Sequence, residues 1–168
     1  FQCNSAIKGK EGAEELLQQG FAAVFLAPGL WEATSLKSGD RDIDGLFSSV
    51  DYLSALRDGR FEEMEQRIRG KTVAVIGGGS VAMDCVESAV RLAAKDVYLV
   101  YSRSYSQMPA EADERIEALE SGVHFLLLNQ PLDYLTDDQN RLRGVKLVRT
   151  CLGEPDESGR RRPENIDG

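Results

Sequence analysis

The chain has 168 residues, of which 42% are hydrophobic and 29% charged, a balance that suits one folded domain or one domain with an appendage. Its formal net charge of -8 makes nucleic acid and anionic membranes poor general partners, because an acidic surface repels phosphate groups. No stretch of the sequence is apolar over the length that crosses a membrane. An anionic ligand therefore needs local attraction, from backbone N–H groups or from a well-placed arginine.

The cysteines and the single histidine argue against a metal centre. Cys3, Cys85 and Cys151 are far apart and form no C-x-x-C pair, and His124 cannot complete a zinc site with them at the usual spacings. Scattered cysteines fit a reducing compartment, so we expect a cytoplasmic protein. The chain begins at Phe1 without methionine and without a signal-peptide pattern, which suggests an excised or processed piece of a longer protein.

The first 70 residues are expected to hold one strand among helices. Ala13–Gln19 has helical spacing of its apolar residues. Phe21–Ala27 is a short apolar run closed by Pro28-Gly29, which is the pattern of a buried strand that ends in a tight turn. The other expected segments are a polar loop and two helices, at residues 30–44, 47–56 and 61–69.

A regular alternation of strands and helices follows. The expected elements are strands at 72–76, 97–101 and 123–128, and helices at 80–94 and 111–120. This order is typical of right-handed βαβ units with a parallel sheet. Two later runs, 132–135 and 142–150, predict antiparallel strands, and 153–168 is expected to be a polar loop or tail. The sequence therefore predicts an α/β fold, a Rossmann-like three-layer domain with a central parallel sheet and a small antiparallel β appendage.

The turn after the first of these parallel strands carries the glycine-rich loop Gly77-Gly78-Gly79-Ser80-Val81-Ala82. In the pattern G-x-G-x-x-A, Gly77 permits the sharp turn, Gly79 leaves room for a pyrophosphate, and Ala82 lets the helix pack close to the sheet. The helix that begins near Ser80 directs free N–H groups and the positive end of its dipole at the phosphates. Because a strand precedes the loop and a helix follows it, the loop predicts a dinucleotide site.

The end of the second parallel strand indicates which dinucleotide is bound. NAD-binding proteins commonly have Asp or Glu there, which accepts hydrogen bonds from the ribose hydroxyls. This chain has Tyr101-Ser102-Arg103-Ser104 instead. A carboxylate would repel a 2′-phosphate, whereas the Arg103 guanidinium can bind one bidentately, with Ser102 and Ser104 as further donors. We therefore predict NADP(H) over NAD(H); the alternative interpretation of Arg103 is a solvated loop arginine.

Three further features are expected to have structural roles. His124 could contact a nicotinamide, but a half-buried histidine in a strand is the favoured interpretation. Asp84, in the first turns of the nucleotide helix, is expected to serve the helix dipole or a loop hydrogen bond. The run Arg160-Arg161-Arg162 is expected to be a solvated loop that could meet a partner or an acidic surface. Hydride transfer needs positioning more than a protein acid or base, so no catalytic residue is predicted.

Several of these motifs together resemble one family. Val75–Asp84, which spans the glycine loop, is similar to the NADPH loop of the glutamate synthase small (β) subunit family, and so is Val100–Arg103 followed by Met108-Pro109-Ala110. Two later stretches, Gly144–Arg149 and Gly153–Pro163, also match that family. The resemblance implies a two-dinucleotide flavoprotein in which NADPH delivers a hydride to FAD and iron–sulfur clusters carry electrons onward.

The resemblance extends to the N-terminal part of the chain. Ala22–Gly29 looks like the strand that closes the first flavin-domain segment of such flavoproteins, although the family usually has Ala-Thr-Gly where this chain has Ala27-Pro28-Gly29. The family's FAD loop and cluster cysteines would lie upstream, so neither FAD nor a cluster is expected on this chain. Cys85 is then expected in a helix core, and the other two cysteines are expected to be incidental.

The candidate cofactor-binding residues combine both lines of reasoning. They are Gly77, Gly78, Gly79, Ser80, Val81, Tyr101, Ser102, Arg103, Ser104, Pro28 and Gly29. The chain departs from the family at two positions, because Ser102 and Glu87 stand where the family often has arginine. The first departure weakens the expected contact with a 2′-phosphate, and the second changes the charge near the nucleotide.

The predicted organisation has four parts: the tail end of an FAD-domain segment with its closing strand at 1–29, a connector at 30–70, an NAD(P)H-binding domain with antiparallel strands at 71–152, and a polar loop or tail at 153–168. The predicted function is the NADPH-binding domain of a flavin-dependent oxidoreductase, inactive in isolation. Its expected partners are NADPH, a flanking FAD domain, and an iron–sulfur domain or large subunit. The alternatives are a self-contained NAD(P)-dependent reductase, for which no Tyr-x-x-x-Lys pair is present, or a non-enzymatic dinucleotide-binding regulatory module.

Overall fold

The computed structural model of the chain describes residues 3–27 and 43–166. The chain divides into two compact units, Phe1–Trp31 and Glu32–Gly168, and each is described by itself. No helix within the described residues is long and apolar enough to cross a membrane. The described residues also hold no group of three or more His, Cys, Asp or Glu side chains placed to bind a metal ion.

The described part of the first unit, residues 3–27, contains one helix, α1 (Gly9–Gln18), which buries none of its residues. The prediction of a buried strand at Phe21–Ala27 is wrong for this structure, because the run forms no strand and the Phe25 side chain is 92% exposed. A strand needs a neighbour to pair with its backbone, and no described strand pairs with this run. Pro28 and Gly29, which the sequence placed in the cofactor site, lie outside the described residues.

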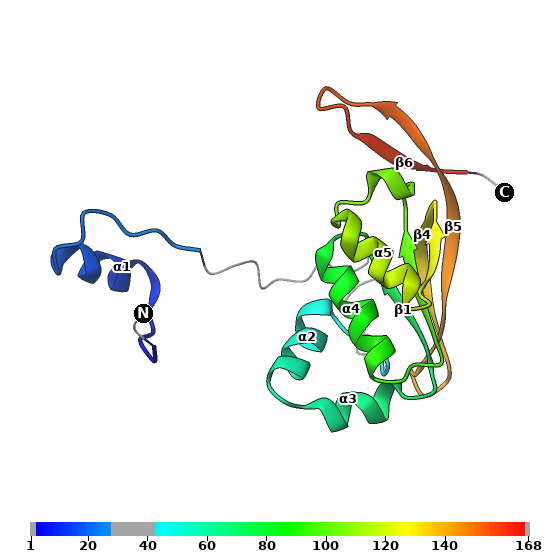
Figure 1. Cartoon of the computed structure of the whole chain (residues 1–168), viewed down its shortest axis with the longest axis horizontal. Coiled ribbons are helices and arrows are strands. Elements are labelled where there is room, and N and C mark those ends of the chain that lie inside the picture. The colour runs from blue at the N-terminus through cyan, green and yellow to red at the C-terminus, as the bar shows by residue number, and fades with distance from the viewer. Residues whose placement is uncertain (1–2, 28–42, 167–168) are drawn as a thin grey trace. The chain divides into compact units, whose positions relative to one another are not determined.

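The second unit is built on a parallel sheet with the strand order β1-β2-β3, as the alternation of strands and helices predicted. Figure 1 shows the helical crossovers α4 and α5 in front of the strands. In chain order the elements are β1 (Thr72–Ile76), α4 (Ser80–Arg91), β2 (Asp96–Tyr101), η1 (Tyr105–Gln107), α5 (Ala112–Glu120) and β3 (His124–Leu127). Because all three strands run the same way, the loops that follow them gather at one edge of the sheet.

The main core lies between β2 and α4. Alternate residues of β2, Val97, Leu99 and Tyr101, face the helices, where they pack with Val86 and Ala89 of α4. Leu99, Val86 and Ala89 are completely buried. This period of two on the strand, matched to a helical stripe, fixes the register between the sheet and α4.

Two more helices, α2 (Ser49–Arg57) and α3 (Phe61–Ile68), cover the outer side of α4 in a second core. Cys85 and Leu92 are the α4 residues that pack into this core, so the expected helix-core role of Cys85 is confirmed. Burial raises the pKa of the Cys85 thiol to about 12. The thiol therefore stays protonated and is not a redox nucleophile.

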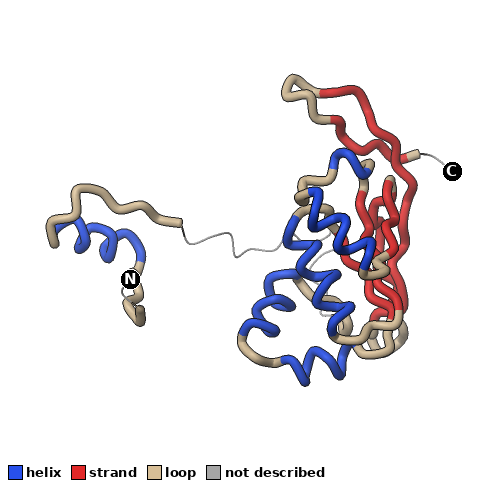
Figure 2. Tube along the Cα trace, in the orientation of Figure 1, coloured by secondary structure: helices blue, strands red, loops and turns tan. Residues whose placement is uncertain are grey.

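A second, antiparallel sheet has the order β4-β5-β6. Its strands are β4 (Asn129–Thr136), β5 (Leu142–Pro155) and β6 (Arg161–Asn165). β4 contacts β2, and Figure 2 shows the helices on one side of the unit and the strands on the other. The layers are therefore helices, the parallel sheet and the antiparallel sheet, in agreement with the predicted fold class.

The prediction of a polar loop or tail at 153–168 is wrong, because β5 continues to Pro155 and β6 pairs with it as a hairpin. Among the described residues, none of the hairpin belongs to either hydrophobic core. The Arg161 side chain donates to the carbonyl oxygens of Gly153 and Leu152, at 2.7 and 2.9 Å. A polar sequence can form such a strand because ladder and side-chain hydrogen bonds, not buried apolar faces, satisfy its backbone.

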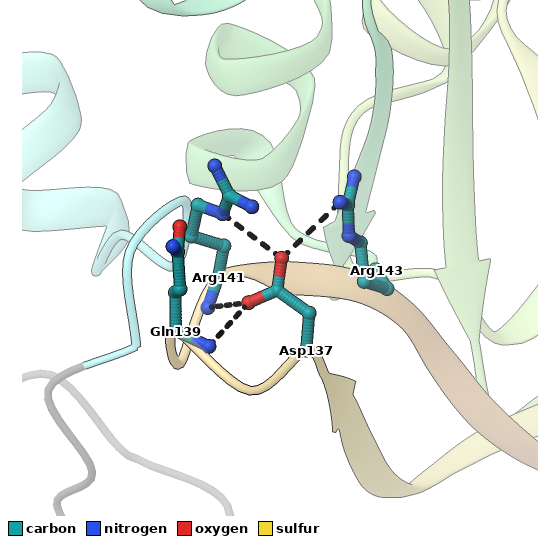
Figure 3. Close-up of polar contacts among 4 residues, drawn as sticks. All are labelled: Asp137, Gln139, Arg141 and Arg143. Atoms are coloured by element: carbon teal, nitrogen blue, oxygen red, sulfur yellow. Dashed lines mark hydrogen bonds and ion pairs between the residues drawn. The ribbon is translucent and has the colours of Figure 1, made fainter.

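The other end of β5 begins at a tight turn organised by one carboxylate, that of Asp137 (Figure 3). One oxygen accepts from the amides of Gln139 and Arg141, both at 3.0 Å. The second oxygen lies 2.9 Å from Nε of Arg141 and 3.1 Å from a terminal guanidinium nitrogen of Arg143. The hydrogen bonds from Arg141 and Gln139 and the charge of Arg141 lower the pKa of Asp137 to about 2.

Candidate functional site

Gly77 makes the sharp turn out of β1 that the sequence pattern predicted. Its φ is +147°, in the region that favours glycine, and its N–H donates to the Val100 carbonyl of β2 at 3.0 Å. A Cβ on Gly77 would lie 3.3 Å from Cβ of Ala82, which is itself buried. The chain therefore returns close to the strand as α4 begins, and only small residues fit at both positions.

Gly78 is the most tightly enclosed glycine of the loop. A Cβ there would lie 2.7 Å from two ring carbons of Tyr101, the last residue of β2. The ring has no room to move, because Tyr101 is buried and its hydroxyl donates to the Gln107 carbonyl at 2.8 Å. The Gly78 carbonyl accepts from the Ala110 amide at 3.0 Å. Tyr101 therefore acts as a platform under the loop, a role that the sequence pattern did not reveal.

Four successive backbone amides, those of residues 78–81, donate to no group within residues 3–27 and 43–166. The next two amides, Ala82 and Met83, both donate to the Gly79 carbonyl. The N-cap Gly79 has no side chain to satisfy the free amides, and a Cβ there would meet only Pro109 Cγ, at 3.9 Å. Free N–H groups and an open approach at the start of a helix are features that can accept a phosphate group.

The side of the loop that faces α5 is acidic. The Ser80 hydroxyl donates to a Glu114 carboxylate oxygen at 2.9 Å, and the same oxygen accepts from the Glu111 amide. Burial, followed by the charges of Glu114 and Glu87, raises the pKa of Asp84 above its ordinary value. Ser80 therefore offers a ligand its amide, since its hydroxyl is already bonded to Glu114.

The segment after β2 is held by hydrogen bonds on both sides of the candidate arginine. The Ser102 carbonyl accepts from the hydroxyl of Thr150, a β5 residue that is only 1% exposed, at 2.7 Å. The Arg103 carbonyl accepts from the Leu128 amide at 3.1 Å. The Ser104 hydroxyl lies 3.1 Å from that of Ser106. β5 and the end of β3 thus hold the backbone that presents Arg103.

Arg103 is half-buried, and its Nε atom is buried without a hydrogen-bond partner in the described structure. The side chain lines a hollow of about 370 Å³ together with four residues of the β5–β6 hairpin: Asp156, Arg160, Arg162 and Pro163. The contact between Arg103 and the hairpin is not predicted by the sequence, because more than fifty residues separate them. The only sequence feature that pointed to an anion site here was the arginine run 160–162, for which a solvated loop was predicted.

Two further residues considered from the sequence are His124 and Val81. His124 is the first residue of β3, at the opposite end of the strand from the loops that follow the sheet. Its ring lies 5.0 Å from that of Tyr98 and its side chain is exposed, so the half-buried interpretation is wrong. Val81, at the start of α4, is 53% exposed beside the free amides.

Comparison with known proteins gives a consistent picture. Residues 4–155 match the family model described as "Pyridine nucleotide-disulphide oxidoreductase". The chain is 42% identical to the NADPH-Fe(3+) oxidoreductase subunit beta of Geobacter sulfurreducens over 95% of its own length. It is 36% identical to the glutamate synthase [NADPH] small chain of Escherichia coli over its whole length. The resemblance stated from the motifs is confirmed.

The chain spans only 24% and 37% of the length of these two relatives. Among solved structures, it matches FprA from Mycobacterium tuberculosis (His57Gln mutant) with a TM-score of 0.66 and 17% identity. That match covers 84% of this chain and 46% of FprA. At this identity the likeness establishes the fold.

Proposed function

This chain belongs to the pyridine nucleotide-disulphide oxidoreductase family, and we propose that it is the NADPH-binding part of a flavin-dependent oxidoreductase. The observation that carries the proposal is the set of free amides at residues 78–81, at the start of α4, with Arg103 at the end of the neighbouring strand. The amides suit a pyrophosphate and the guanidinium suits a 2′-phosphate. This arrangement favours NADP(H) over NAD(H).

Each residue of the site has a distinct task in this proposal. The amides of Gly78, Gly79, Ser80 and Val81 bind the pyrophosphate, and the missing Cβ of Gly79 lets it approach. Tyr101 acts under the loop as a positioning residue, since its buried ring sets the place of Gly78. Arg103 binds the 2′-phosphate, and the Ser102 and Ser104 hydroxyls supply further donors.

The whole protein's activity extends beyond this chain. Bound NADPH supplies a hydride, and we propose that FAD, held by a flanking domain, accepts it. The exposed apolar side chains Phe21, Phe25 and Leu26 support a flanking domain, because such a run gains stability when another strand covers it. We propose three parts: the FAD-domain segment at 1–29, the connector at 30–70, and the NAD(P)H-binding domain at 71–168. The last part now includes the hairpin, which the sequence had placed in a separate loop or tail. An iron–sulfur domain or large subunit completes the proposed set of partners.

We propose a cytoplasmic location because Cys3, Cys85 and Cys151 are all free thiols. Proteins of oxidising compartments more often pair their cysteines as disulfides.

The experiment that tests the proposal is a titration of the protein with NADP+ and with NAD+, followed by the same titrations of Arg103→Gln. We expect tighter binding of NADP+, and a Kd for NADP+ that rises roughly tenfold to a hundredfold in the variant, because a charged hydrogen-bond donor to phosphate is lost. The Kd for NAD+ should not change. The control is Arg91→Gln, which removes an exposed arginine that pairs with Glu87 on α4.

Two results would contradict the proposal. The first is an equal Kd for NADP+ and NAD+ in the unaltered protein, which would remove the case for a 2′-phosphate site. The second is no binding of either dinucleotide, which would remove the case for the glycine loop as a pyrophosphate site.

A further inference from the structure

We propose that the β5–β6 hairpin is part of the nucleotide site, and that Arg160 and Arg162 join Arg103 in binding the 2′-phosphate of NADP(H). The inference rests on the proposed function and extends the phosphate contact from one arginine to three. The supporting observations are the attachment of the hairpin, the direction of its arginines, their lack of partners, and the hollow that they share with Arg103.

The hairpin is attached firmly to the segment that carries Arg103. Thr150 of β5 is almost completely buried, donates its hydroxyl to the Ser102 carbonyl at 2.7 Å, and donates its amide to the Leu128 carbonyl at 2.9 Å. β5 then continues without interruption into the hairpin, and β6 returns with Leu152 opposite Pro163. The position of the hairpin relative to Arg103 is therefore set by a buried hydrogen bond and by the strand ladder.

The three arginines of the run 160–162 do not share one role. Arg161 is half-buried and donates to two β5 carbonyl groups, so it is part of the hairpin's own structure. Successive side chains along an extended chain point to opposite faces. Arg162, the next residue of β6, therefore points away from Arg161, and both Arg162 and Arg160 line the hollow that also contains Arg103.

The three guanidinium groups that share the hollow lack partners. Within the described residues, the side chains of Arg103, Arg160 and Arg162 form no ion pair and no hydrogen bond. The Nε atom of Arg103 is also buried, so it is a buried donor without an acceptor. A buried donor costs stability until an acceptor reaches it. In a chain with a net charge of -8, three guanidinium groups around one hollow, none of them in an ion pair or side-chain hydrogen bond within the described residues, form a local anion site.

Among the described residues, Asp156 is the one acid that lines this hollow, and an oxygen of its carboxylate is bonded within the hairpin turn. One oxygen accepts from the Ser158 hydroxyl at 2.6 Å and from the amides of Ser158 and Arg160, both at 3.0 Å. These bonds, led by the Ser158 hydroxyl, lower the pKa of Asp156, with a further contribution from the charge of Arg162. Three guanidinium groups against one carboxylate leave a net positive charge.

A phosphate monoester is the chemical class that fits this arrangement. It carries close to two negative charges near neutral pH and offers three acceptor oxygens, which planar guanidinium groups bind bidentately. Arg103 is the second residue after β2, at the sheet edge where the free amides of the glycine loop also lie. A single NADP(H) bound at that edge would present its pyrophosphate to the amides and its 2′-phosphate to the hollow.

The test compares the double variant Arg160→Gln/Arg162→Gln with unaltered protein and with the control Arg143→Gln. The control removes one arginine at the opposite end of β5, where Asp137 pairs with it. The probes are NADP+ and NAD+, and the fragments 2′,5′-ADP and 5′-AMP, which differ in the 2′-phosphate. We expect the double variant to raise the Kd for NADP+ and 2′,5′-ADP roughly tenfold or more, with no change for NAD+ or 5′-AMP. The Kd of Arg162→Lys for NADP+ should lie between the values for the unaltered protein and the double variant, because lysine keeps the charge but not the planar guanidinium group.

An unchanged ratio of NADP+ to NAD+ affinity in the double variant would overturn this inference. If Arg103→Gln still weakened the binding of NADP+ selectively, the proposed function would stand. Arg160 and Arg162 would then be suited to bind an acidic protein surface and not the nucleotide. An equal fall in affinity for both dinucleotides would also overturn it, since the hairpin would then not act on the 2′-phosphate. Thermal unfolding of each variant establishes that the exposed substitutions leave the fold intact.

Discussion

The two ends of β5 carry arginines in opposite circumstances. At its start, Arg141 and Arg143 surround the Asp137 carboxylate, and every oxygen of that carboxylate is used (Figure 3). At its far end, the hairpin arginines Arg160 and Arg162 share a hollow with Arg103 and pair with no described carboxylate. Figure 1 shows this end of β5, with β6, as the hairpin that extends beyond the rest of the unit.

The difference separates arginines that hold the fold from arginines that are free for a ligand. The turn at Asp137 also secures the connector, because the Asp44 amide donates to the Asn140 carbonyl at 3.1 Å and the Leu142 amide donates to the Asp44 carbonyl at 2.8 Å. The charges of Arg141, Arg143 and Asp137 are paired with one another in this turn. The hairpin arginines have no such internal role, and their charge becomes useful only when an anion arrives.

The largest effect is expected from Gly78→Ala, which damages the nucleotide end without altering any charge. The new methyl group would lie 2.7 Å from the Tyr101 ring, which is buried and bonded to Gln107. We expect a loss of about 1–3 kcal/mol of unfolding free energy, typical of an overpacked site, and a marked loss of affinity for both dinucleotides. Denaturant unfolding and the NADP+ and NAD+ titrations measure the two effects.

The control for Gly78→Ala is Gly122→Ala in the turn between α5 and β3, where a Cβ would meet no atom within 4 Å, although the φ of +85° adds backbone strain. That strain predicts some loss of stability with dinucleotide binding retained. Unchanged dinucleotide binding in Gly78→Ala would show that the Tyr101 platform does not set the loop geometry.

A smaller effect is expected from Thr150→Val, which separates β5 from the Arg103 segment with little change in shape. The Ser102 carbonyl would lose a 2.7 Å hydrogen bond at a site where Thr150 is 1% exposed. We expect a cost of about 1–2 kcal/mol in unfolding free energy, because a buried acceptor is left without its donor. The Kd for NADP+ should rise more than that for NAD+, since the hairpin and Arg103 lose their common support. Thr150→Ser, which keeps the hydroxyl, should restore the ratio of the two affinities.

The smallest effect is expected from Asp137→Asn, which removes the charge that the turn arginines share. The folded-state pKa of Asp137 is about 2, below its ordinary 3.8, so the ionised carboxylate stabilises the fold above the ordinary pKa. That contribution falls as pH drops through the folded value. The unaltered protein should therefore unfold at a higher temperature than Asp137→Asn at neutral pH, and the difference should shrink as the pH falls below the ordinary value of 3.8 and vanish only below about pH 2. The NADP+ to NAD+ ratio should not change, and a change would break the contrast between the two ends of β5.

Local pattern was sufficient for most of the elements. Apolar runs at 72–76 and 97–101, with the apolar stripe of the helix expected at 80–94 between them, predicted the parallel βαβ core correctly. The pattern failed at Phe21–Ala27, where an apolar run forms no strand, and at 153–168, where a polar run forms a hairpin. In both cases strand formation depends on a pairing partner, which a single segment does not encode.

Local sequence was enough to predict the glycine loop, the small residues at Gly77 and Ala82, and the arginine after β2, because each depends on neighbours a few residues away. Contacts made on folding explain why Gly78 must lack a side chain, why the Cys85 thiol is unreactive, and where the arginine run 160–162 lies. Those answers depend on contacts between distant segments: the Tyr101 ring under Gly78, the helices packed over Cys85, and β5 anchored at Thr150 beside Arg103. Backbone pairing and buried side-chain contacts create these neighbourhoods, and sequence periodicity carries no information about them.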